Sequence, residues 1–511
     1  MFKHLKDRVT YCIGNDGKKY AIKTYTSQKG ELLPNREAVK EILYLKYLKH
    51  DNIVDIADIY FYDKINTQII MPRYHTNLYS LKNIKENDIK IIVYNVTQGL
   101  KYLHDKNIVH RDIKPENILT NSDFSSVKIC DFGFCKLLPH EDIENMNREG
   151  TSIQYTAPEL LNNDYKYNYD KSIDIWSLGC TIWFLFFNKD LFNGNDSNSV
   201  LDMIYYILDP NGNNDNVKYT KRIKSSNILT DFETKRATLS QEWRDLLFWM
   251  ITYHPLKRLT CDDILSHPFS ALDEKGQEIK SETLSKSEKK VINFSKRSNN
   301  DIITCAWIVL VYIEWKLQFK TILSTIILYD YIRDKLKYNQ QELIISCLSI
   351  CADFYENDII TIGEYVDITD NSVKAETINI IRTFILSQID PKSVIEIPDY
   401  FSPWSSQLGP FFADAEKGRN ILYLTSYIYG DYHELGVKKL NDIVIHSLNV
   451  IKLDDVINNR LGFTDNIKIN PEYCYIIKNW ILSISDICRK ADVFDYKKMY
   501  DQRLLKQLGI N

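Results

Sequence analysis

The feature that most constrains this chain is an ordered series of five short motifs within its first 180 residues. Single motifs of this length arise by chance, but five in one order and at sensible spacing do not. They place lysine, aspartate and asparagine side chains at fixed intervals along a chain of mixed strand and helix pattern. The motifs are YAIK at residues 20–23, HRDIKPEN at 110–117, DFG at 131–133, APE at 157–159 and DIWSLG at 174–179.

The series resembles the signature set of eukaryotic-type Ser/Thr protein kinases. The resemblance implies an α+β bilobal kinase fold, with residues 1–76 as the small lobe and residues 77–270 as the large lobe. It also implies transfer of the γ-phosphoryl group of ATP to Ser or Thr hydroxyls of protein substrates, with ATP and Mg²⁺ as cofactors. Catalysis of this kind depends mostly on positioning and charge neutralisation.

Four residues would carry the chemistry in this resemblance. Asp112 would orient the substrate hydroxyl and accept its proton, and Lys114 would lie near the transferred phosphoryl group. Asp131 and Asn117 would bind Mg²⁺. Taken singly, such residues are as often surface charges or helix caps, but the ordered set favours catalysis.

The nucleotide would be held by the small lobe and by the segment that joins the lobes. Lys23 would bind the α- and β-phosphates and pair with a carboxylate on the next helix, where Glu37 and Glu41 are both candidates. The distance to the expected helix end favours Glu41. Met71 would lie at the back of the adenine pocket, and Arg73 would lie in the hinge.

Two structural contacts also follow from the resemblance. Glu159 would form a buried ion pair with Arg258 that ties the activation segment to the large lobe. Asp174 would hold the backbone of the catalytic loop.

Hydrophobic periodicity predicts the elements that position these residues. Residues 8–26 alternate like a hairpin around a Gly-Asn-Asp-Gly turn, residues 35–50 have helical spacing, and residues 68–71 read as a buried strand. From residue 77 to residue 269 the pattern is mainly helical, and beyond residue 301 it is helical throughout.

Two segments resemble the cyclin-dependent branch of the kinases. Residues 38–42, AVKEI, are similar to the AIREI part of the PSTAIRE helix, and residues 191–194 and 204–210 are similar to the segment before that group's large-lobe insert. A generic kinase fold is the alternative for these residues alone.

The half of the chain after residue 300 resembles a cyclin. Residues 321–332 are similar to the second helix of a cyclin box, and residues 365–371, YVDITDN, are close to a cyclin signature. Residues 343–352 are apolar almost all round, so this helix should be buried on every side. Some other helical bundle is the alternative.

The expected domain order after the kinase lobes has three parts. A Lys-, Glu- and Ser-rich linker at residues 271–299 leads to a cyclin box at 300–395 and to a second, degenerate cyclin-like helical domain at 396–511. A flexible linker of about 30 residues spans roughly 30 Å, which gives an effective concentration on the order of millimolar. We therefore expect a kinase activated in cis by its own cyclin-like domain. The alternatives are a pseudokinase scaffold and a cyclin-like module that recruits a separate host cell-cycle kinase.

The sequence departs from the family at the Gly-rich loop. Counted back from Lys23, the three glycines of the family's loop should fall within the first seven or so residues. The chain has Phe2, Lys3, His4, Lys6 and Asp7 there instead. A backbone cradle for phosphates needs glycine for close approach. This absence is the reason for keeping the scaffold alternative.

The activation segment also departs from the family. Three basic residues stand where the family has arginines around an activating phosphate, namely Lys40, Arg111 and Lys136. Residues 134–150 contain no Ser, Thr or Tyr, and Asn147 occupies the expected position of the phosphate. We expect Glu144 or Glu149 to bind the cluster instead and predict no dependence on an activating kinase.

Three further positions differ from the resemblance. Residues 154–156, QYT, replace a stretch in which the family has an Arg that shapes a proline pocket, so the resemblance does not imply a preference for Pro after the target residue. Asp353 stands about where a cyclin has a Lys, and Ile381 about where it has a Glu. Docking of the two halves would then need other contacts.

Composition excludes several function classes. The net charge of -4 gives no basic surface for nucleic acid or an anionic membrane. The ten Cys form no CxxC pair, which argues against zinc and disulfides and for an intracellular protein with reduced thiols.

The apolar run at residues 302–313 is too short to span a bilayer and predicts a core helix. Heavy use of Ile, Asn, Lys and Tyr would suit a large AT-rich DNA virus.

Overall fold

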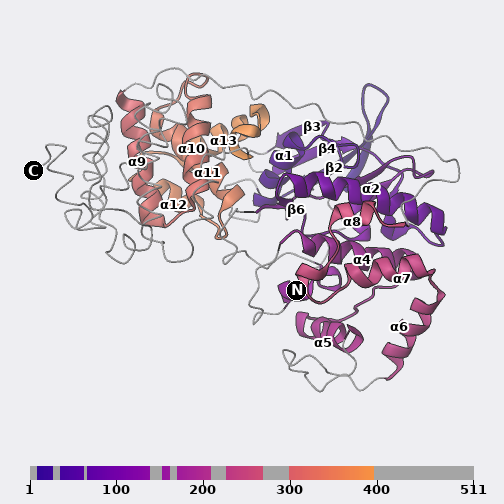
Figure 1. Ribbon diagram of the computed structural model, residues 1–511. Helices are drawn as coiled ribbons and strands as arrows, with labels where there is room; N and C mark the ends of the chain where they lie inside the picture. Colours follow the sequence, from indigo (N-terminus) through magenta and orange to yellow (C-terminus); the bar gives the residue numbers. More distant parts are fainter. Residues whose placement is uncertain are drawn as a thin grey trace, which may run out of the picture. The chain divides into compact units, whose positions relative to one another are not determined.

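The computed structural model of the chain describes residues 9–26, 35–62, 66–138, 152–161, 170–208, 226–268 and 299–395. The chain divides into two compact units, and each is described by itself. The first consists of Met1–Lys29 and Pro34–Glu288, and the second of Gly30–Leu33 and Lys289–Asn511. The first unit combines strands and helices, whereas the described part of the second is helical (Figure 1).

Four antiparallel strands form the small lobe in the order β1-β2-β4-β3. The predicted hairpin is present, and Gly17 in its turn has a φ of 75°, a conformation that glycine adopts without strain. The predicted buried strand at residues 68–71 is the centre of β4, while β3 was not anticipated. The strands are β1 (Val9–Ile13), β2 (Lys19–Tyr25), β3 (Asp58–Tyr62) and β4 (Asn66–Pro72).

The register of these strands decides which side chains share a face. Tyr11 on β1 lies opposite Ala21 on β2, and Ala21 lies opposite Met71 on β4. Lys23 is two residues further along β2 and therefore lies on the same face. The face thus combines aromatic, apolar and basic side chains.

Helix α1 (Arg36–Tyr47) contacts β4. It lies within the helix expected over residues 35–50 and ends three residues earlier. Asn35 begins it as an N-cap, because its side chain accepts hydrogen bonds from the backbone amides of Glu37 and Ala38 at 2.8 and 3.3 Å. Glu41 is fully buried on this helix. A buried carboxylate is tolerated only with partners, so this position demands a nearby donor.

Short strands frame the loops of the large lobe. β6 (Ile108–Val109) pairs with β9 (Lys136–Leu137), and β7 (Ile118–Thr120) lies between β5 (Thr76–Asn77) and β8 (Val127–Ile129). Residues 110–117 therefore run between β6 and β7, and residues 131–133 run between β8 and β9. Two motifs far apart in the sequence are held beside each other in this way.

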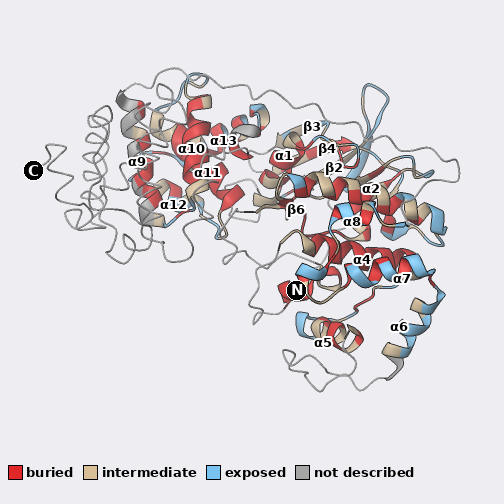
Figure 2. Cartoon of the chain, viewed as in Figure 1, coloured by how far each residue is buried: buried red, intermediate tan, exposed pale blue. Residues whose placement is uncertain are grey.

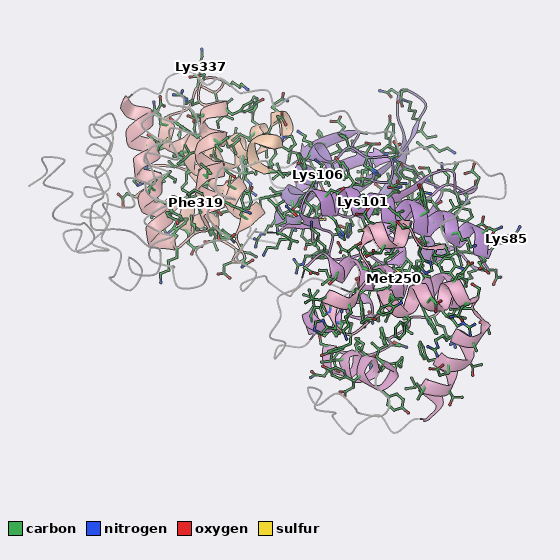
Figure 3. All side chains as sticks on the ribbon, in the orientation of Figure 1. Lys85, Lys101, Lys106, Met250, Phe319 and Lys337 are labelled. Carbon is green, nitrogen blue, oxygen red and sulfur yellow. The ribbon has the colours of Figure 1, made fainter. Side chains whose placement is uncertain are left out.

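Helices make up most of the large lobe, as predicted. Helix α4 is buried on almost every side, and its Trp176 stacks on Phe192 with ring centroids 5.4 Å apart. Met250, at the end of α7, is fully buried, whereas Lys85 before α2 is exposed (Figure 3). The helices are α2 (Glu86–Asp105), α3 (Pro158–Leu161), α4 (Ser172–Phe187), α5 (Ser197–Leu208), α6 (Ser226–Thr238), α7 (Gln241–Met250) and α8 (Cys261–Leu265).

The second unit is built around α11, which is buried from Leu343 to Tyr355 (Figure 2). The prediction of a helix buried on all sides at residues 343–352 is confirmed. Helices α9, α10 and α13 all contact α11. The helices are α9 (Asn299–Trp315), α10 (Phe319–Ile332), α11 (Gln340–Tyr355), α12 (Ile362–Asp367), α13 (Ala375–Gln388) and α14 (Lys392–Ile395).

The predicted fold class is confirmed, with a sheet-containing lobe, a helical lobe and a following all-α domain. The apolar run at residues 302–313 lies within α9, and none of the helices in the described ranges is long and apolar enough to cross a bilayer. Four predicted segments lie outside the described residues: the Gly-loop region before Val9, most of the activation segment, the linker and the second cyclin-like domain at 396–511.

Candidate active site

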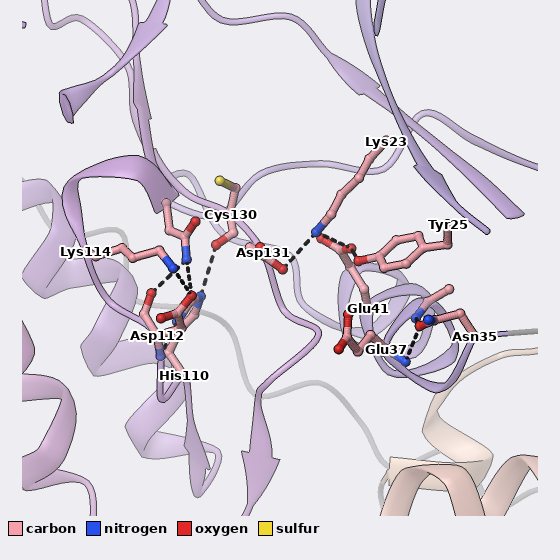
Figure 4. Close-up of polar contacts among 12 residues, drawn as sticks. Lys23, Tyr25, Asn35, Glu37, Glu41, His110, Asp112, Lys114, Cys130 and Asp131 are labelled. Carbon is pink, nitrogen blue, oxygen red and sulfur yellow. Dashed lines mark hydrogen bonds and ion pairs between the residues drawn. The ribbon is translucent and has the colours of Figure 1, made fainter. Parts of the chain in front are cut away.

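Asp112 is the centre of a small hydrogen-bonded group on the loop between β6 and β7 (Figure 4). The Nζ of Lys114 lies 2.6 Å from its Oδ2. The side-chain amide of Asn117 donates to the same Oδ2 at 2.7 Å and to the backbone carbonyl of Asp112 at 2.8 Å. The structure thus brings the three predicted catalytic residues together, with Asp112 only 4% exposed.

Ser152 joins this group from the segment before α3. Its Oγ accepts a hydrogen bond from Lys114 at 2.7 Å, and its backbone amide lies 3.4 Å from Oδ1 of Asp112. The Ser152 hydroxyl and amide therefore both contact the catalytic loop. That activation needs no phosphate stays a prediction.

Asp174 holds the backbone of the loop, as predicted. Its carboxylate accepts hydrogen bonds from the amides of His110 and Arg111 and from Nε2 of His104, each at 2.9 Å. Burial by itself would raise the pKa of Asp174, but the hydrogen bond and charge of His104 outweigh it and lower the pKa below its usual value. A charged Asp174 holds Arg111 at a φ of 71°, a strained conformation typical of functional loops.

Lys23 bridges two carboxylates that come from different elements. Its Nζ lies 2.9 Å from Oε2 of Glu41 on α1 and 2.8 Å from Oδ1 of Asp131. The prediction that Glu41 rather than Glu37 pairs with Lys23 is confirmed. Asp131 has a φ of 70°, which again marks a strained residue in the loop.

Both charges of the Lys23–Asp131 pair are stabilised. Burial lowers the pKa of Lys23, but the charges of Asp131 and Glu41 together outweigh it and hold the pKa well above its usual value. Burial likewise raises the pKa of Asp131, and the charge of Lys23 reverses this to give a lowered pKa. The site therefore presents a fixed ammonium group next to a fixed carboxylate.

The donor set fits Mg²⁺. Asn117 uses its amide nitrogen on Asp112, which leaves its Oδ1 as an oxygen ligand, and Asp131 is an ionised carboxylate. Within the described residues, no three His, Cys, Asp or Glu side chains cluster as a metal site. Two protein oxygens completed by phosphate oxygens and water are the usual arrangement for this ion.

Two side chains on the sheet face beside Lys23 differ in exposure, since Met71 is 7% exposed and Tyr11 is 60% exposed. The place of Met71 at the back of an adenine pocket stays a prediction. The guanidinium of Arg73 lies 4.2 Å from the centroid of the Tyr11 ring. Arg73 also donates its backbone amide to the carbonyl of Lys19 at 3.0 Å, which fixes the hinge to the sheet.

The predicted ion pair between Arg258 and Glu159 is present. Two nitrogens of Arg258 bind the two oxygens of Glu159 at 2.5 and 2.7 Å, and both side chains are fully buried. Because the pair is bidentate and its remaining donors reach backbone carbonyls, both charges are compensated.

Of the basic cluster expected around an activating phosphate, Arg111 is 8% exposed and donates to the carbonyl of Phe134 at 3.5 Å. Lys136 lies on β9 opposite Val109, and Val109 is two residues before Arg111 in the sequence. The acidic residues expected to bind the cluster, Glu144 and Glu149, lie outside the described residues.

The second unit carries a buried ion pair that the sequence analysis did not predict. Asp353 on α11 binds Arg382 on α13, which also donates to the carbonyl of Ser349 at 3.1 Å. Ile381, which stands about where a cyclin has a Glu, is buried in the apolar core. Asp353, which stands about where a cyclin has a Lys, is used in a contact within the unit.

Comparison with known sequences identifies the class of protein. The chain matches the protein kinase domain over residues 7–270 and the cyclin N-terminal domain over residues 271–392. The first match covers half of the chain, and the chain belongs to the protein kinase family. The second shows that this kinase domain is fused to a cyclin domain.

Three curated protein kinases are similar in sequence to about half of the chain. The chain is 31% identical to mitogen-activated protein kinase 5 of Oryza sativa subsp. indica over 265 residues, which are 49% of this chain and 70% of the relative. It is 32% identical to mitogen-activated protein kinase 13 of Homo sapiens over 270 residues, which are 50% and 71%. It is 30% identical to serine/threonine-protein kinase NLK2 of Xenopus laevis over 272 residues, which are 50% and 60%. The kinase domain is therefore of the Ser/Thr type, while the cyclin-dependent branch stays a prediction.

Proposed function

We propose that this chain transfers the γ-phosphoryl group of ATP to Ser or Thr hydroxyls of proteins and that its cyclin domain activates it in cis. The observation that carries the proposal is the position of Lys23, which bridges Glu41 and Asp131 over 2.9 and 2.8 Å. Phosphoryl transfer needs such a fixed cation beside a carboxylate that can hold Mg²⁺.

The residues around Asp112 have complementary roles in this proposal. Asp112 accepts the proton of the substrate hydroxyl, and Lys114 neutralises charge on the transferred group. Asn117 orients Asp112 and, with Asp131, would hold Mg²⁺, which neutralises phosphate charge when bound. Lys23 exchanges its contact with Asp131 for the α- and β-phosphates.

The adenine ring would lie on the sheet face formed by Tyr11, Ala21 and Met71. Stacking of a base on an aromatic ring contributes about 1–3 kcal/mol and does not depend on glycine. Tyr11, which Arg73 contacts at 4.2 Å, would thus contribute to binding of the adenine ring. The phosphates would be held by Lys23 and, through Mg²⁺, by Asp131.

Two exposed apolar side chains lie on one helix of the cyclin domain. Ile380 and Phe384 lie one turn apart on α13 and are 42% and 45% exposed, on a helix whose opposite face is buried. A tethered partner present at about millimolar effective concentration needs only a weak contact to remain bound. We infer that the tethered cyclin domain favours the Lys23–Glu41 pair and that no activating phosphate is required.

The test measures phosphate transfer from ATP to generic Ser/Thr peptides by the full chain, with Asp131→Asn as the blank. A double substitution, Ile380→Glu with Phe384→Glu, changes the two exposed apolar side chains of α13. Its control is Ile359→Glu, which changes a side chain that is 72% exposed elsewhere in the same unit.

We expect activity at least about 100-fold above the blank, a loss of about tenfold or more in the double variant and no change in the control. Activity equal to the blank would contradict the kinase function and favour the alternative of a pseudokinase scaffold. Equal activity in the double variant and the control would exclude docking through α13.

A further inference from the structure

Tyr25, at the end of β2, is bound to the same carboxylate oxygen as Lys23. The two residues are two positions apart on one strand, so their side chains lie on one face (Figure 4). The Tyr25 hydroxyl donates to Oε2 of Glu41, which also accepts from Nζ of Lys23 at 2.9 Å. Tyr25 is 2% exposed and Glu41 fully buried. No sequence motif includes Tyr25.

The two donors to Glu41, Lys23 and Tyr25, differ in how many other groups they also contact. Lys23 is shared, since its Nζ also lies 2.8 Å from Asp131 and 5.1 Å from the centroid of the Tyr25 ring. In the proposed reaction its three N–H groups must also serve phosphate oxygens. The hydroxyl of Tyr25 has a single proton, and this proton goes to Glu41.

The remaining oxygen of Glu41 makes this second donor important. Oε1 is buried and has no hydrogen-bond partner among the residues that the structure describes, so within them Oε2 makes all the hydrogen bonds of this buried carboxylate. Burial and the charge of Glu41 hold the pKa of Tyr25 well above its usual value, so the hydroxyl keeps its proton at any working pH. Without Tyr25, movement of Lys23 toward a phosphate would leave Glu41 buried with a weakened single contact.

We propose that Tyr25 is a positioning residue that holds Glu41, and with it helix α1, in the inward position while Lys23 serves the nucleotide. The inference rests on the proposed kinase function. It adds that the inward position of α1 is maintained within the kinase unit itself, whatever the cyclin domain contributes.

The experiment compares Tyr25→Phe with Tyr20→Phe in the full chain. Both substitutions remove a tyrosine hydroxyl of β2 that is bonded to a carboxylate, but Tyr20 binds Asp16 in the exposed hairpin turn at 2.7 Å. We expect kcat to fall about tenfold in Tyr25→Phe, with KM for the peptide unchanged, because a hydrogen bond to a charged group is lost. Tyr20→Phe should stay within about twofold of the parent.

A double-mutant cycle distinguishes positioning from general support of the core. If Tyr25 acts through Glu41, adding Tyr25→Phe to Glu41→Gln should cost less than about twofold, although it costs about tenfold alone. Full tenfold losses in both backgrounds would show that Tyr25 acts by another route, and would overturn the proposal.

Hydrogen exchange of the α1 amides, measured without nucleotide, gives a readout that does not need activity. Protection over residues 40–47 should fall in Tyr25→Phe and persist in Tyr20→Phe. An inactive parent chain would overturn the kinase function while the exchange measurement still tests Tyr25. Unchanged protection in Tyr25→Phe would overturn the role of Tyr25 even in an active enzyme.

Discussion

His110 illustrates how one residue of the catalytic loop is fixed by atoms on both sides of its ring. Nε2 faces the carbonyl of Cys130 at 3.1 Å, and Nδ1 faces the backbone amide of Asp112 at 3.3 Å. The ring also meets Phe132 edge-on, with centroids 5.2 Å apart. These contacts suit a neutral imidazole with its proton on Nε2, because a second proton on Nδ1 would oppose the amide of Asp112.

This geometry predicts a pH dependence of stability. Burial lowers the pKa of His110 below its unfolded value of about 6.5, so below that pH the unfolded chain binds a proton that the folded chain does not. The free energy of unfolding should therefore fall as pH decreases from 7.5 to 5.5, by up to about 1.4 kcal/mol per pH unit for this group. Urea unfolding at several pH values measures the slope.

The variants for this test are His110→Phe and His75→Gln. The first removes the titrating ring at the buried position and should reduce the slope. The second removes an exposed histidine and should leave it unchanged. The pKa of His50 is also lowered by burial, so some slope should persist in both. An identical slope in His110→Phe and the parent would show that His110 does not titrate as argued.

Helix α1 shows what can and what cannot be read from a sequence at the scale of an element. Its position and its choice of Glu41 follow from apolar spacing and from distance to neighbouring motifs, because both are local properties. The contact of Tyr25 with Glu41 was missed, since tyrosine on a strand usually indicates packing alone. Strand periodicity, which places Tyr25 on the face of Lys23, was the available signal.

The same limit explains the other misses. β3 (Asp58–Tyr62) has aromatic residues but no clear alternation of burial, and its role as a strand depends on pairing with β4. The ion pair of Arg382 on α13 with Asp353 on α11 was not anticipated, because no motif links the two residues. Contacts between elements distant in sequence supply this information, whereas a motif does not.

The N-cap of α1 gives a prediction at this scale. Asn35→Ala removes two hydrogen bonds to the first turn and should cost about 1 kcal/mol of stability. Asn339→Ala removes the comparable cap of α11 in the second unit and should cost about the same. Only Asn35→Ala should also lower the rate of phosphate transfer, because Glu41 lies on the capped helix. Equal rates of phosphate transfer in the two variants would show that the N-cap of α1 does not affect catalysis.

The fusion of a kinase domain with a cyclin domain has consequences for the whole molecule. When an activator is tethered, its local concentration does not depend on how much protein is present. The specific activity of the full chain should therefore stay constant on dilution from micromolar to nanomolar. A protease site inserted in the predicted linker at residues 271–299 should make activity fall on dilution after cleavage, and uncleaved protein is the control. Dilution-sensitive activity of the intact chain would indicate activation between molecules.

The two oxygens of the Asp112 carboxylate differ in their surroundings. Oδ2 is occupied by Lys114 and Asn117 at 2.6 and 2.7 Å, whereas Oδ1 has one long contact with the amide of Ser152 at 3.4 Å. Among the described residues, only Oδ1 therefore has lone-pair capacity left for a substrate proton. We predict that the hydroxyl to be phosphorylated approaches from the side of Ser152, so that the asymmetry of a single side chain would set the direction of approach.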